Sequence, residues 1–149
     1  MTRGLFNKML SFKIPIAKIA GLKLHSFDGN SAQISVKLGW LNQNPFKSMF
    51  WAVQGMAAEF STGTLCIDKI QKSDHKFSML VVGLEANFTK KAVGKIIFTC
   101  DQGKELDEIL QKAIETGEGQ TLKMRSIGKD EQNDQVAEFF FTWSFKVKK

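Results

Sequence analysis

The chain has 149 residues, of which 43% are hydrophobic and 24% are charged. This is the size and composition of one globular domain and excludes a disordered or fibrous protein. Thirteen phenylalanines and three tryptophans occur beside no tyrosine, so we expect the rings to fill a dry core. The net charge of +6 favours anionic partners. No apolar run approaches the ~20 residues of a membrane span, and the N-terminus lacks the core of a signal peptide. We therefore expect a cytoplasmic protein without integral membrane association.

The first 38 residues predict a helix followed by a β-hairpin. Apolar residues recur at helical spacing before Pro15, which interrupts the helix. They are Leu5, Phe6, Met9, Leu10 and Phe12. Lysines on this helix could contact a membrane or an acidic partner, or simply be solvated. Residues 21–28 and 31–38 alternate in polarity around Gly29 and Asn30, which predicts two strands joined by a two-residue turn.

Residues 45–62 predict a helix of a different kind. Its apolar side chains cover every side of the helical wheel, which is typical of a helix buried all round. Asn44 before Pro45, or Ser48 a little later, would supply the N-cap. Gly63 would end or bend the helix.

The second half of the chain is mostly β-strand. Strands are predicted over 77–88, 92–100, 121–129 and 137–147, with an amphipathic helix over 103–117. The last strand is the clearest, because six apolar side chains alternate onto one face. They are Ala137, Phe139, Phe141, Trp143, Phe145 and Val147.

These elements predict one α+β domain over residues 1–149, with a curved antiparallel sheet of five or six strands around the central helix. A cystatin-like or nuclear-transport-factor-like fold is the alternative. It would lay an amphipathic helix across one face of the sheet.

The order of elements resembles the hotdog fold and, within it, the PaaI-like acyl-CoA thioesterases and a related thioesterase-like group. The local motif is NPFKSMFWAVQGMAAEFSTG. Asn44, Ser48, Glu59 and Gly63 stand at the positions where that group has an Asn, a small or polar residue, a carboxylate and a Gly. The closing FFFTWSFKVKK also resembles the last strand of the family.

Glu59 is the candidate catalytic carboxylate. It is the one acidic side chain in the apolar stretch from Met49 to Phe60, and burial would raise its pKa toward that of a general base. The resemblance implies that it attacks, or directs water at, a thioester carbonyl, while N–H groups around Phe50 and Trp51 form the oxyanion hole. A structural role for Glu59, at the helix end or paired with a lysine across a dimer interface, is the alternative.

Asn44 is the second candidate catalytic residue, and it could orient the thioester or the partner subunit's Glu59. We expect the substrate to contact five residues near the start of the helix. They are Ser48, Met49, Phe50, Trp51 and Gln54. Alternatively, Asn44 and Ser48 would act as helix N-caps, and Gln54 would be a buried amide whose hydrogen bonds are all made within the protein.

The expected partner is an acyl-CoA-type small molecule, with coenzyme A present only as part of the substrate. The Lys90, Lys91 and Lys95 cluster and the Lys146, Lys148 and Lys149 cluster are candidates to hold its phosphates, although solvated strand ends have the same pattern. Nucleic acid fits poorly, because the aromatics alternate onto the core face. Cys66 and Cys100 belong to no CxxC pair, and no metal site is predicted.

The sequence therefore predicts an acyl-CoA or acyl-carrier thioester hydrolase, working as a homodimer or a tetramer. One departure from the pattern of the PaaI-like family favours an alternative function. Phe50, Trp51 and Ala52 stand where catalytic PaaI-like members often have a His with small residues. Such bulk could fill the thioester site, so the alternative function is a non-catalytic binder of acyl chains or another apolar ligand on the same scaffold.

Overall fold

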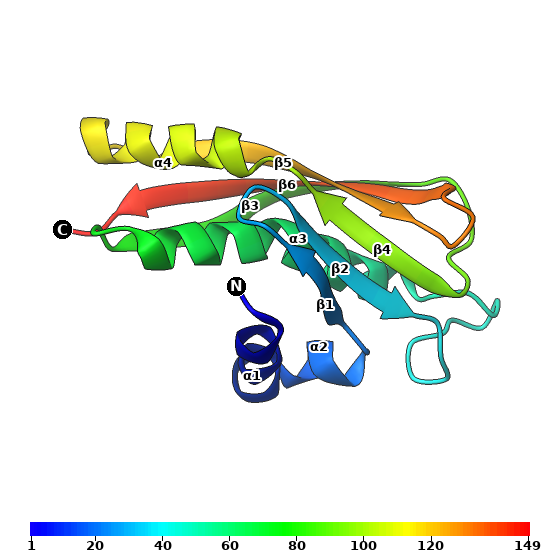
Figure 1. Cartoon of the computed structure of the whole chain (residues 1–149). Helices are drawn as coiled ribbons and strands as arrows, with labels where there is room; N and C mark the ends of the chain where they lie inside the picture. The colour runs from blue at the N-terminus through cyan, green and yellow to red at the C-terminus, as the bar shows by residue number, and fades with distance from the viewer.

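Six strands form one antiparallel sheet in the computed structural model, which describes residues 1–149 (Figure 1). The strands lie in the order β1-β2-β4-β5-β6-β3. Their bounds are Lys23–Phe27 for β1, Ala32–Lys37 for β2, Phe77–Phe88 for β3, Lys95–Cys100 for β4, Gln120–Lys129 for β5 and Gln135–Val147 for β6. The helices are α1 over Arg3–Lys13, α2 over Pro15–Ile19, α3 over Trp51–Lys72 and α4 over Gly103–Thr116. The predicted α+β fold, with a sheet of five or six strands around a central helix, is confirmed, and the sheet has six.

The alternation in β6 places its rings against α3. Phe139, Phe141, Trp143 and Phe145 are buried, whereas the residues between them are only half-buried or exposed. The Trp143 indole lies over Gly63 of α3, where an added Cβ would already be 3.5 Å from the ring. Its N–H donates a hydrogen bond to Thr62 Oγ1 at 2.9 Å. The phenylalanine-rich face thus forms the dry core that the composition predicted.

β4 and β5 share the shortest ladder in the sheet. These two strands pair at only three positions, Ile97 to Thr99 against Ile127 to Lys129. There the Phe98 ring occupies the place of a side chain at Gly128, since a Cβ would be 2.5 Å from the ring. The missing side chain therefore lets β5 approach the ring directly and bend around the core.

The central helix begins later than its sequence predicted. α3 starts at Trp51, its N-cap is Phe50 without a side-chain cap bond, and it runs through Gly63 to Lys72. Neither Asn44 nor Ser48 caps it, so that prediction is wrong. Gly63 does not end the helix, because it packs against a ring instead.

One stripe of α3 is left partly uncovered by its own chain, which corrects the expectation of burial on every side. Its members recur at the spacing of one helix face. They are Trp51, Ala52, Gly55, Met56 and Glu59, and Trp51 is 52% exposed. The stripe starts at the N-terminal end of α3.

The remaining helices pack around this core. α1 contacts α3 through the Phe6 and Phe60 rings, whose centroids are 5.7 Å apart. α4 lies along β5 and β6 and reaches α3 through the Lys69–Asp107 ion pair. In Figure 1, α1 and α2 lie at the lower side of the molecule, away from α4. None of the helices combines the length and apolarity needed to cross a membrane.

Candidate functional site

A cavity of about 620 Å³ opens at the N-terminal end of α3. One wall is the loop that leads into the helix, and the other is the segment 88–92 after β3. Six of the seven predicted site residues line it, namely Asn44, Ser48, Met49, Phe50, Trp51 and Gln54. Glu59 does not. The second wall was not predicted, because only its lysines stood out in the sequence.

Asn44 organises the loop instead of capping the helix. Its Oδ1 accepts hydrogen bonds from the N–H groups of Phe46 at 2.9 Å and Ser48 at 3.3 Å. Its Nδ2 donates to Ser48 Oγ at 3.1 Å, and its own N–H donates to the Ser48 carbonyl at 2.8 Å. Lys47 between them has a φ of 61°, in the left-handed region that a tight turn requires. The amide of Asn44 therefore holds the loop that forms the cavity wall.

The first turn of α3 offers two backbone donors. The Phe50 N–H donates to the Asn42 carbonyl at 2.9 Å, so it is not available as predicted. The N–H groups of Trp51 and Ala52 have no acceptor, as expected for the first residues of a helix. Oriented, unpaired N–H groups at a helix N-terminus favour negative charge.

The large side chains at the start of α3 line the cavity. The Phe50 and Trp51 rings meet edge to face, with centroids 6.1 Å apart, and both are about half exposed. The Trp51 ring lies near Gly55, one turn farther along α3, where an added Cβ would be 3.9 Å from the ring. An indole placed there forms an apolar wall.

Gln54 brings a buried polar group to the cavity. The residue is 5% exposed, and its Nε2 donates a long hydrogen bond of 3.4 Å to the Met49 carbonyl. Its Oε1 is buried and has no partner, so the alternative of a satisfied amide is not what the structure has. A buried carbonyl oxygen without a donor costs about 1–3 kcal/mol, and a ligand N–H or O–H in the cavity could satisfy it.

Glu59 lies farther along α3, on its uncovered stripe. It is eight residues beyond Trp51, or ~12 Å along the helix axis at 1.5 Å per residue. Its side chain is half-buried, and burial raises the pKa of its carboxyl above the ordinary value. No lysine of the same chain pairs with it. The predicted raised pKa is thus present, but the carboxylate and the cavity are not brought together within one chain.

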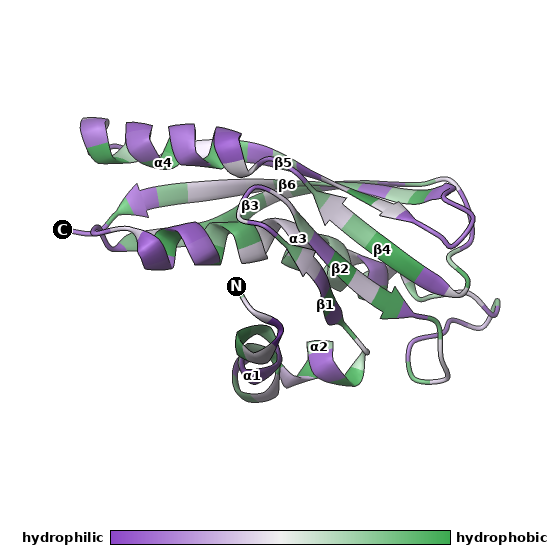
Figure 2. Ribbon diagram, viewed as in Figure 1, coloured by the Kyte–Doolittle hydropathy of each residue, from purple (hydrophilic) through white to green (hydrophobic).

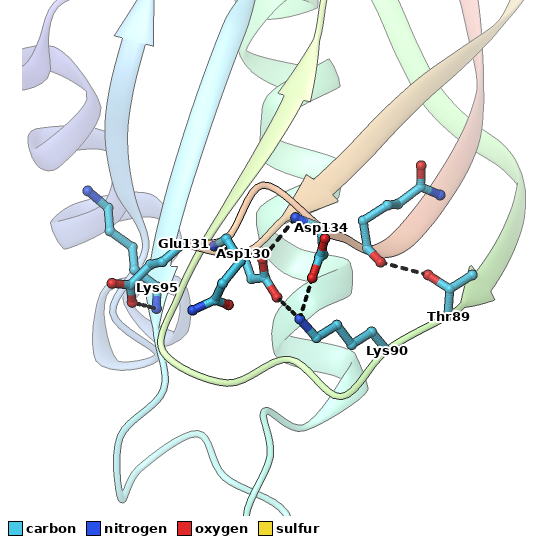
Figure 3. Close-up of polar contacts among 8 residues, drawn as sticks. Thr89, Lys90, Lys95, Asp130, Glu131 and Asp134 are labelled. Carbon is cyan, nitrogen blue, oxygen red and sulfur yellow. Dashed lines mark hydrogen bonds and ion pairs between the residues drawn. The ribbon is translucent and has the colours of Figure 1, made fainter.

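The second wall is held by an ion-pair cluster (Figure 3). Lys90 Nζ lies 2.6 Å from Asp130 Oδ2 and 2.8 Å from Asp134 Oδ2, both in the β5–β6 turn. Thr89 adds a hydrogen bond from Oγ1 to the Gln135 carbonyl at 2.9 Å. Lys90 therefore has two carboxylate partners, and it fits poorly as a phosphate ligand. This corrects its predicted role.

The other predicted lysines are also separated by the fold. Lys91 lines the cavity without an ion pair, whereas the Lys95 side chain lines a different cavity, beside Arg3 and Lys23. The Lys146, Lys148 and Lys149 cluster lies at the far end of the β3–β6 ladder, where Val147 pairs with Phe77. Of these lysines, Lys91 is therefore the one that lines the cavity without a carboxylate partner.

Replacing Lys90 with methionine is expected to raise the pKa of the Asp130 carboxyl toward its ordinary value, because Lys90 is the first cause of its lowered pKa. A lowered pKa stabilises the fold above the ordinary value, and this contribution is lost as the pH falls through the folded-state pKa. The stability difference between wild type and variant should therefore shrink in acid. NMR titration of Asp130 and thermal unfolding between pH 2 and 7 measure both effects.

Lys91→Met is the matched control, because Lys91 is the next residue in the chain, is exposed and has no carboxylate partner. An unchanged Asp130 titration in Lys90→Met, or an equal change in the Lys91 variant, would contradict this role.

Solved structures resemble the whole chain. A protein from Pseudomonas aeruginosa described as "Probable Thioesterase" has a TM-score of 0.83 at 20% identity, covering 99% of this chain and 97% of its own. A thioesterase from Haemophilus influenzae has a TM-score of 0.72 at 15% identity, covering 99% and 92%. The chain thus has the same fold as these proteins, the hotdog fold that the resemblance predicted.

A third similar structure is a thioesterase enzyme from Staphylococcus aureus, solved with a glutamine changed to alanine and, separately, with a glutamate changed to alanine. Each has a TM-score of 0.68 at 14% identity, covering 89% of this chain and at least 98% of its own. No curated protein matches the sequence. The model of the family described as "Domain of unknown function (DUF4442)" matches residues 2–145.

Proposed function

The chain belongs to the DUF4442 family, and we propose that it hydrolyses the thioester of an acyl-CoA or acyl-carrier substrate. The observation that carries the proposal is the apolar cavity at the N-terminus of α3, where the Trp51 N–H has no acceptor. A thioester carbonyl oxygen there would accept from Trp51 and Ala52 as negative charge develops on it. Similar proteins described as thioesterases support this chemistry.

We place the second half of the site on a partner subunit. Glu59 lies outside the cavity of its own chain, on the uncovered stripe of α3. The edge strand β3 is unpaired on one side and exposes Leu80, Val82, Leu84 and Phe88. A homodimer joined along β3 and α3 would cover these groups and bring the partner subunit's Glu59 toward the cavity.

The spacing of the two polar residues supports this arrangement. Asn44 and Glu59 are fifteen positions apart, and the glutamine and glutamate altered in the Staphylococcus aureus enzyme have the same separation.

In the proposed mechanism Glu59 takes a proton from water, which attacks the thioester carbon. The carbon–sulfur bond breaks and the thiolate leaves with that proton, so the products are a carboxylic acid and a free thiol. Gln54 Oε1 would accept a hydrogen bond from the substrate, and Lys91 is a lining cation without an ion pair.

The purified protein should release free thiol from at least one member of an acyl-CoA panel that varies in chain length and aromaticity. A thiol-reactive dye measures the release, and boiled protein is the control. No turnover on the whole panel, together with an apolar ligand retained in native mass spectrometry, would support the alternative function. In that case Phe50 and Trp51 would serve a binder of acyl chains.

A further inference from the structure

The two N-terminal helices expose an unusual amount of apolar surface. Phe12 is 77% exposed, Ile16 and Ile19 are each 64% exposed, and Leu5 is 59% exposed. Only one side of these helices packs on the body, through residues such as Phe6 and Leu10. We call the exposed apolar side chains of α1 and α2, with the cations between them, the N-terminal face. The ribbon of Figure 2 shows that hydrophobic and hydrophilic residues are interspersed along these two helices.

A groove runs along this face between α1 and the C-terminal half of α3. It has a volume of about 650 Å³, with an apolar lining that includes Leu5, Met9 and Phe12 of α1 and Ile67 of α3. Lys8 and Lys13 stand at its border. The groove is separate from the cavity at the start of α3, since the two share no lining residue.

The charge of the segment has one sign. Residues 1–27 contain five basic side chains and no Asp or Glu. The basic residues are Arg3, Lys8, Lys13, Lys18 and Lys23, and none of them forms an ion pair. Cations interleaved with exposed apolar side chains on a short helix are the pattern of a segment that lies in a bilayer interface.

We propose that the N-terminal face docks peripherally on an anionic lipid bilayer. The apolar side chains would enter the boundary between headgroups and acyl chains, while the lysines would contact anionic headgroups. A second copy of the chain is the less favourable occupant, because a two-fold contact would bring the same unpaired cations together. The proposal does not depend on thioester hydrolysis, since none of these residues belongs to the candidate active site.

Vesicle flotation tests the proposal with the full chain. The protein should float with vesicles of phosphatidylcholine and phosphatidylglycerol, should not float with phosphatidylcholine alone, and should be released by 0.5 M salt. Each lysine near such a surface contributes a factor of about five to partitioning, so Lys8→Glu/Lys13→Glu should lower the partition coefficient by about 25-fold or more.

Lys104→Glu/Lys112→Glu on α4 is the matched control, because it changes the net charge equally at exposed sites outside the face. Phe12→Ser should also weaken flotation, whereas Trp40→Ser should not, although Trp40 is 82% exposed. No flotation of the wild type, or equal losses in the two lysine pairs, would overturn the proposal. So would a change of oligomeric state in Phe12→Ser, because the face would then be a subunit contact.

Discussion

Replacing Glu59 with glutamine is expected to lower kcat for thioester hydrolysis by about 10²–10⁴-fold, the usual contribution of a general base. Glutamine keeps the size of the side chain but cannot take a proton from water. Because burial is the one cause of the raised pKa of Glu59, the neutral amide should leave the fold intact. Steady-state thiol release, with circular dichroism as a check of folding, measures the effect. Turnover equal to that of the wild type would remove Glu59 from the mechanism.

The raised pKa of Glu59 also predicts a pH dependence. Activity should rise with pH through the folded-state pKa, which burial holds above the ordinary value of a glutamate carboxyl, because only the carboxylate is a base. Stability should change in the opposite direction. The folded state holds the proton more tightly than the unfolded state, so the free energy of unfolding falls as the pH rises between the two pKa values. Glu59→Gln should lack this fall, which denaturant titrations between pH 4 and 7 can measure.

A mixing experiment separates a shared site from a site within one chain. Asn44→Ala should be inactive, because the loop that forms the cavity wall loses its side-chain hydrogen bonds. A re-associated mixture with Glu59→Gln should regain activity that neither variant has alone, since one site of the mixed dimer has both intact parts. Absence of any regain, despite mixed dimers seen by native mass spectrometry, would place the whole site in one chain.

Phe139→Ala is expected to have the largest effect on stability, at about 3–5 kcal/mol of unfolding free energy. The Phe139 side chain is fully buried, stacks on Phe141 at 6.0 Å between centroids, and meets Phe98 and Phe88 edge to face. Phe88 lines the cavity, so the void left by the ring should also loosen that wall. Chemical denaturation measures the loss of unfolding free energy. Hydrogen exchange of the Phe88 amide reports whether the cavity wall has loosened.

Phe140→Ala provides the control at the neighbouring position. This ring is only half-buried, faces the other side of the sheet and lies under Lys123 at 5.0 Å. The same truncation should cost less than about 1 kcal/mol there. Similar losses at both positions would contradict the assignment of the two faces of β6.

Local patterns were enough to predict the elements and the core. In β6 every second residue is apolar, and because strand side chains alternate between faces this pattern alone assigns Phe139 and Trp143 to the interior. Gly29 has a φ of 88° and lies in the turn between β1 and β2, as the dipeptide predicted. The composition of the central helix likewise predicted an element enclosed by the sheet.

The start of that helix required the tertiary structure. Asn44 and Ser48 were equally good caps by residue type, but their hydrogen bonds to each other close a loop, and the helix begins only at Trp51. The unpaired N–H groups that matter for the site are therefore those of Trp51 and Ala52. A cap and a loop-closing amide use the same side-chain atoms, so only the path of the backbone distinguishes them.

The role of the charges was also decided by long-range contacts. The sequence alone determined the excess of cations, an α+β domain with a sheet of five or six strands, and a single carboxylate between Met49 and Phe60. Folding then paired Lys90 with carboxylates forty and forty-four positions away, left Lys91 beside the cavity and kept Glu59 outside it. Periodicity along the chain reports which face a residue occupies, whereas the partner of a charged group depends on which distant segment the fold brings beside it.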